Sequence, residues 1–144
     1  MTSFTPPRNS LLVDTGFLVA LFRRADKLRP AARAFLAGNR APLITVAAVI
    51  VETCFFLNAD EKLTLLEWVR RGALTVREAP AEAYPLLAWI IAKYADRDPD
   101  FTDAALIWLA QDIACRRILT VDKVDFSVYR TKAGKEFEIL AWRP

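Results

Sequence analysis

The stretch Ser10-Leu-Leu-Val-Asp14-Thr15 is a short apolar run that ends in a carboxylate and a hydroxyl. An apolar run of this length, closed by a polar residue, predicts a buried β-strand. Comparable runs recur along the chain and predict four more strands, at residues 42–46, 74–76, 117–122 and 137–140.

Segments with helical spacing of apolar residues lie between these strands, at residues 15–22, 30–38, 47–57, 60–71, 82–94 and 103–114. Short strands that alternate with helices are typical of an α/β domain with a mainly parallel sheet. The sequence therefore predicts a three-layer sandwich around a mainly parallel sheet of four to five strands. The chain of 144 residues has room for one domain, which we place at 10–144, after a flexible tail at 1–9.

The absence of histidine excludes several kinds of chemistry. A Ser-His-Asp or Cys-His nucleophile is impossible, and so is a zinc site of the usual His/Cys type. Any metal must be held by oxygen ligands, which favours magnesium or manganese. No apolar stretch is long enough to span a membrane and the first residues do not resemble a signal peptide, so we expect a cytoplasmic protein.

The net charge is +3, and basic residues are clustered at 23–24, 70–71, 116–117 and 130–135. A mildly basic surface suits a polyanionic partner such as RNA. Ordinary solvated faces explain the same clusters equally well.

Carboxylates follow the predicted strands repeatedly. Asp14 ends the first strand, and Glu52 lies one and a half turns into the helix after the second. Asp103 begins a helix, and Asp122 ends the fourth strand. Because the carboxyl ends of parallel strands meet at one edge of a sheet, we expect these four side chains to converge there.

Each carboxylate also has a simple structural explanation. Asp14 and Asp122 are plausible turn or capping residues, and Asp103 suits the N-terminus of a helix. Glu52 is harder to explain, because its segment is otherwise almost entirely apolar and a buried glutamate is costly without a partner. Four acids at one edge would raise each other's pKa, and a bound divalent cation removes that penalty.

Four motifs together resemble the PIN domains, and among them the VapC-type toxins of toxin–antitoxin pairs. They are Leu11-Leu-Val-Asp14-Thr-Gly-Phe-Leu-Val-Ala-Leu21, the glutamate of Val49-Ile-Val-Glu52, Tyr94-Ala-Asp-Arg-Asp-Pro-Asp-Phe-Thr-Asp103-Ala-Ala-Leu106 and Ile118-Leu-Thr-Val-Asp122-Lys-Val-Asp-Phe126. The resemblance extends from about residue 11 to 140.

The resemblance implies an endoribonuclease whose catalytic and metal-binding quartet is Asp14, Glu52, Asp103 and Asp122, with Mg²⁺ or Mn²⁺ as cofactor. Thr15 would be a hydroxyl close to the metal, and Asp100 and Asp125 are candidates for further ligands or for holding water. The resemblance also implies an RNA substrate, a small antitoxin protein as partner, and a homodimer.

Three alternatives remain: a free-standing PIN nuclease in RNA processing, a non-catalytic RNA-binding module, and a phosphatase that uses the same metal site. Phe22 and the tryptophans of the helical segments are expected in the core or at a dimer surface rather than as base-stacking platforms. The apolar residues between Phe55 and Trp68 are a candidate dimer face.

Overall fold

The fold is an α/β sandwich built on a five-stranded, all-parallel sheet, in the strand order β3-β2-β1-β4-β5. The computed structural model describes residues 6 and 9–144, so the tail expected at 1–9 falls almost wholly outside the described residues. The strands are β1 (Leu11–Val13), β2 (Leu43–Val46), β3 (Thr75–Arg77), β4 (Arg117–Leu119) and β5 (Glu138–Ile139). The predicted fold class is confirmed, and every predicted strand is present.

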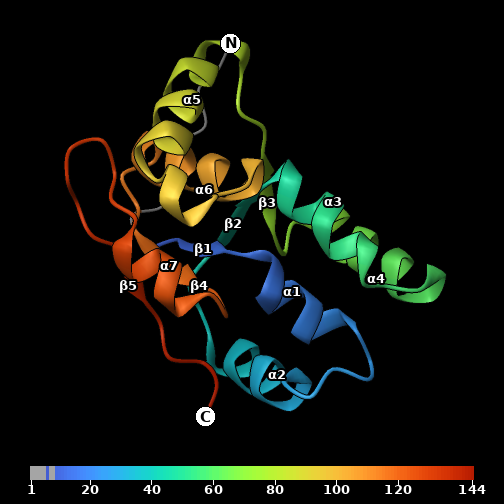
Figure 1. Ribbon diagram of the computed structural model, residues 1–144. Helices are drawn as coiled ribbons and strands as arrows, with labels where there is room; N and C mark the ends of the chain where they lie inside the picture. The colour runs from blue at the N-terminus through green and yellow to red at the C-terminus, as the bar shows by residue number, and fades with distance from the viewer. Residues whose placement is uncertain (1–5, 7–8) are drawn as a thin grey trace.

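The helices cover both faces of this sheet. In Figure 1, α5 and α6 lie on one side of β1, and α1 and α2 lie on the other. The helical elements are α1 (Thr15–Phe22), α2 (Arg29–Gly38), α3 (Ala47–Phe55), α4 (Ala59–Arg70), η1 (Ala81–Ala83), α5 (Tyr84–Lys93), η2 (Ala95–Arg97), α6 (Phe101–Asp112) and α7 (Lys123–Val128). No helix of the described residues is long and apolar enough to cross a membrane.

Strand β1 is central, with β2 on one side and β4 on the other. Its residues are fully buried, as are the facing residues Ile118 and Leu119 of β4. Leu12 pairs with Ile118 and Val13 with Leu119, so β1 and β4 end side by side. This register places Asp14 and the residues after β4 at the same edge of the sheet.

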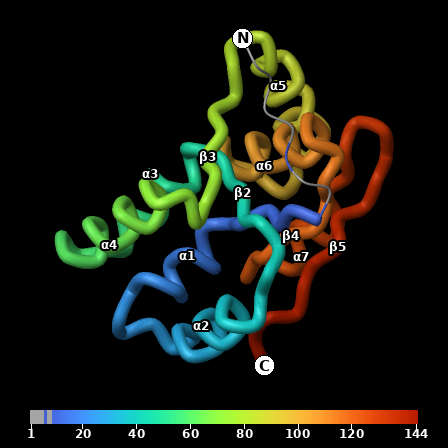
Figure 2. The backbone as a smooth tube through the Cα atoms, turned by 180° about the vertical axis from the view of Figure 1, so that it is seen from behind, coloured from blue at the N-terminus to red at the C-terminus, as the bar shows by residue number. Residues whose placement is uncertain are grey.

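Two expectations about helices were wrong. The apolar segment after β2 was expected to be a buried helix, yet α3 leaves Val51 57% exposed. Phe55, at the end of α3, is 79% exposed, as the candidate dimer face requires. Figures 1 and 2 show why, because α3 and α4 extend sideways beyond the sheet and only one side of the pair packs on the rest of the protein. Helix α7 was not predicted either, because its six residues are too few to show a helical period.

The start of α6 also differs slightly from the prediction. The helix begins at Phe101 rather than Asp103, because Asp100 caps it by accepting a hydrogen bond from the Asp103 N–H at 2.9 Å. Asp103 therefore lies in the first turn of the helix.

Candidate metal centre

Asp14 and Asp122 lie at the carboxyl ends of two paired strands. Asp14 caps α1, where it accepts a 2.7 Å hydrogen bond from the Thr15 N–H. Asp122 caps α7 by accepting from the Asp125 N–H. The capping roles considered for both residues are thus real, and they fix where each carboxylate points.

Thr120 connects these two positions. Its hydroxyl, fully buried, donates to Asp14 Oδ2 at 2.7 Å and accepts from the Asp122 N–H at 2.9 Å. Sequence reasoning missed this residue, although its place two positions before Asp122 was the available signal.

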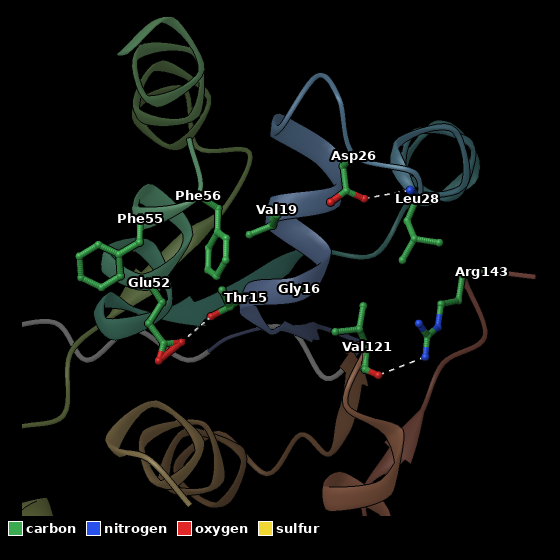
Figure 3. A pocket seen from close by; sticks show the side chains of 10 residues that line it. All are labelled: Thr15, Gly16, Val19, Asp26, Leu28, Glu52, Phe55, Phe56, Val121 and Arg143. Carbon is green, nitrogen blue, oxygen red and sulfur yellow. Dashed lines mark hydrogen bonds between the residues drawn. The ribbon is translucent and has the colours of Figure 1, made fainter. Parts of the chain in front are cut away.

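Glu52 reaches the same region from α3. The Thr15 hydroxyl donates to Glu52 Oε2 at 2.9 Å, as Figure 3 shows, so the first residue of α1 orients the glutamate. Thr15 therefore lies beside one of the four predicted acidic residues. Glu52 is half-buried rather than enclosed.

Asp103 enters from the first turn of α6. The buried phenol of Tyr129, just after α7, donates to Asp103 Oδ2 at 3.1 Å. The Tyr129 ring is itself held edge-on between Tyr94 and Phe126. Tyr129 was not predicted, because no spacing in the sequence relates it to Asp103.

The pKa values show that the carboxylates interact. Burial raises the pKa of Asp14 to about 6, with smaller contributions from the charges of Glu52 and Asp122, against the lowering effect of its hydrogen bonds. Burial also raises the pKa of Asp103 to about 7, reinforced by Asp100, Asp14 and Asp122. The pKa of Asp122 is likewise raised, by burial first and then by Asp125.

Asp100 and Asp125, the candidate extra ligands, are both engaged. Asp100 caps α6, and Asp125 forms an ion pair with Arg97 at 3.0 Å. Arg97 therefore offsets one negative charge at the edge of the cluster.

The donor set suits magnesium or manganese, because the four predicted residues offer only carboxylate oxygens. Within the described part of the chain, no three acidic or cysteine side chains are gathered tightly enough to form a ready-made metal site. A bound cation would offset the mutual repulsion of these carboxylates and favour their closer approach.

An apolar pocket of about 730 Å³ opens beside Glu52. Figure 3 shows Glu52 and Thr15 at one end of it and Arg143 at the other, where Arg143 donates to the Val121 carbonyl at 3.1 Å. Between them, the pocket is lined mainly by Gly16, Val19, Leu28, Phe55, Phe56 and Val121.

Residues 11–132 match the sequence profile of the PIN domain. The chain belongs to the PIN-domain family. The match spans all four predicted acidic residues, and the resemblance found in the sequence is confirmed.

Among known proteins, this PIN domain is similar to Ribonuclease VapC26 of Mycobacterium tuberculosis. The two are 27% identical over 134 residues, which are 90% of this chain and 99% of that one.

Solved structures share the fold at lower identity. VapC20 of Mycobacterium tuberculosis, a Sarcin-Ricin loop cleaving toxin, superposes with a TM-score of 0.69 at 19% identity, over 79% of this chain and 91% of that one. A toxin–antitoxin complex from Klebsiella pneumoniae superposes with a TM-score of 0.64 at 13% identity, over 91% of this chain and 96% of that one. FitAcB from Neisseria gonorrhoeae superposes with a TM-score of 0.57 at 18% identity, over 89% of this chain and 96% of that one.

Proposed function

We propose that this PIN domain is a divalent-metal-dependent endoribonuclease and the toxin of a toxin–antitoxin pair. The observation that carries the proposal is a set of hydrogen bonds at one edge of the sheet, in which Thr120 joins Asp14 to Asp122 and Thr15 holds Glu52. Asp103 lies near enough for its charge interaction with Asp14 and Asp122 to raise its pKa further. The relative whose name states a ribonuclease supports RNA as the substrate.

The four carboxylates Asp14, Glu52, Asp103 and Asp122 would hold Mg²⁺ or Mn²⁺. Such an ion would lower the pKa of a water for attack on phosphorus and would offset the charge of the phosphate oxygens. The protein's own contribution is to orient the ligands: Thr120 holds Asp14, Thr15 holds Glu52 and Tyr129 holds Asp103. Oriented ligands keep their geometry when a cation and substrate enter.

Cleavage of RNA by purified protein tests this function. We expect the wild type to cut total RNA with magnesium or manganese and to stop in chelator. Asp14→Asn should lower the rate by about two orders of magnitude or more, because it removes one oxygen ligand and one negative charge. Asp60→Asn makes the same chemical change on the exposed start of α4 and should cut normally. Equal cutting by wild type and Asp14→Asn would refute the proposed site.

The apolar pocket beside Glu52 is the proposed docking surface for the antitoxin. Structural neighbours of this chain include a toxin–antitoxin complex, and an exposed pocket lined by Phe55 and Phe56 suits the apolar face of a peptide helix. A segment bound there would also cover Glu52 and restrain the enzyme. A short companion gene next to this one should encode the antitoxin, and co-expression of that antitoxin should relieve the toxicity of this protein. If co-expression relieves no toxicity, the alternative of a free-standing nuclease is favoured.

A homodimer is proposed through the outer side of α3 and α4. Leu63 and Leu66 are 65% and 51% exposed, and they follow the exposed Phe55 along the chain. An apolar surface of this kind is usually covered by a partner in solution.

A further inference from the structure

A second, smaller hollow lies at the far end of α1, where α1, α2 and α4 meet. It encloses about 160 Å³, and its lining combines apolar side chains with three arginines, Arg24, Arg29 and Arg33. On the α4 side its wall includes Trp68, whose ring packs edge-on against Phe22 at 5.2 Å.

The three guanidinium groups have one carboxylate near them, that of Glu61, whose pKa is lowered mainly by backbone hydrogen bonds and also by the charge of Arg24. None of them forms an ion pair with a carboxylate among the described residues. Glu61, the acid of this hollow, instead accepts from the backbone N–H groups of Arg24 and Asn58, both at 2.8 Å. Three guanidinium groups thus share one carboxylate, and the hollow carries an excess of positive charge.

Only one of the three arginines has a clear structural role. Arg29 donates from Nη1 to the Leu21 carbonyl at 3.1 Å, and so caps the last turn of α1. Arg24 and Arg33 are exposed, and no side-chain hydrogen bond engages them within the described residues. Guanidinium groups that form no ion pair with a carboxylate are well suited to bind phosphate oxygens.

We propose that this hollow, which we call the arginine pocket, binds a backbone phosphate of the RNA substrate away from the cleaved bond. The proposal rests on the proposed ribonuclease function. Helix α1 runs from Asp14 to the pocket and has eight residues, or about 12 Å. A strand of several nucleotides can therefore contact both ends of the helix.

Phosphate is favoured over an acidic protein segment for two reasons. The pocket is too small for a peptide helix, which is about 10 Å across. The larger apolar pocket beside Glu52 already offers a surface of the right character for a protein partner.

RNA binding in the absence of cleavage tests the proposal. The probe is a fluorescent single-stranded RNA of about 12 nucleotides, bound by Asp14→Asn protein at several salt concentrations. When Arg24→Ala and Arg33→Ala are both added to this Asp14→Asn protein, RNA binding should weaken about ten-fold. The slope of log affinity against log salt concentration should become shallower by about 1. Arg40→Ala, another exposed arginine outside the pocket, is the matched control and should change little.

Separate outcomes identify the source of any effect. Inorganic phosphate should compete with the RNA only weakly, because a single phosphate lacks the other contacts of the RNA strand. Competition at micromolar phosphate would indicate a small-molecule site and would overturn the proposal. Unchanged RNA affinity and salt slope in the arginine double variant would also overturn the proposal. So would a double variant that still binds RNA normally but no longer binds an acidic peptide that the parent protein binds. A wild type that neither binds nor cuts RNA would refute the proposed function, whatever the pocket variants do.

Discussion

Thr120 is the residue on which the acidic edge depends most directly, because its hydroxyl is the buried donor to Asp14. Thr120→Val keeps the shape and removes the donor, so an ionised Asp14 would lose a charge-assisted hydrogen bond. We expect a loss of about 1–3 kcal/mol in the free energy of unfolding at pH 8, measured with urea in chelator. Thr64→Val on exposed α4 removes a hydroxyl that bonds only to the backbone within its own helix, and should cost little.

The raised pKa values of Asp14 and Asp103 predict how stability depends on pH. Both groups bind protons more tightly in the folded protein than in the unfolded chain. The stability that these two groups contribute without metal is therefore complete below about pH 4, the pKa of a carboxyl in the unfolded chain, and is lost as the pH rises to about 6 for Asp14 and about 7 for Asp103. Between pH 5 and pH 8 we expect a loss of about 1–2 kcal/mol for Asp14 alone.

Denaturation in chelator at pH 5 and pH 8 measures this difference. Asp14→Asn should flatten the profile, and adding Mg²⁺ at pH 8 should stabilise the wild type but not the variant. A wild type that is more stable at pH 8 than at pH 5 in chelator would contradict the expectation.

Helix α1 approaches the loop after β4 so closely that its second residue must lack a side chain. A Cβ on Gly16 would overlap the Val121 methyl groups, which lie on the same loop as Asp122. Gly16→Ala should therefore destabilise the fold by about 1–3 kcal/mol and move Asp14 relative to Asp122.

A double-variant cycle separates this clash from other effects. Val121→Ala removes the overlapping methyl groups, so Gly16→Ala should cost much less in that background. Equal costs in both backgrounds, measured by urea unfolding, would show that another contact is responsible.

Elements with a strong local pattern could be predicted from the sequence, and contacts between distant residues could not. Asp14 and Asp122 were predicted at one edge because each follows an apolar strand. The contacts of Thr120 with Asp14 and of Tyr129 with Asp103 were not predicted, since they join residues 106 and 26 positions apart and depend on how the strands and helices are arranged. The exposure of Val51 was missed for a related reason, because an apolar segment does not reveal whether a protein layer or a partner covers it.

At the scale of the whole molecule, the exposed side of α3 and α4 predicts self-association. Leu63→Glu together with Leu66→Glu should convert a dimer into a monomer without loss of helix content, because both side chains are already exposed. Lys62→Glu alters charge on the same helix and serves as the control. Sedimentation equilibrium measures the mass, and a wild type that is monomeric at high concentration would exclude this interface.

The central place of β1 has a consequence for synthesis of the protein. Its neighbour β4 is made about a hundred residues later, so Asp14 leaves the ribosome long before Thr120 and Asp122 exist to meet it. At typical elongation rates of about 5–20 residues per second, the nascent chain spends several seconds without a complete acidic edge. If the protein is the ribonuclease proposed above, it is harmless to its own messenger until Thr120 and Asp122 have been made and have reached Asp14.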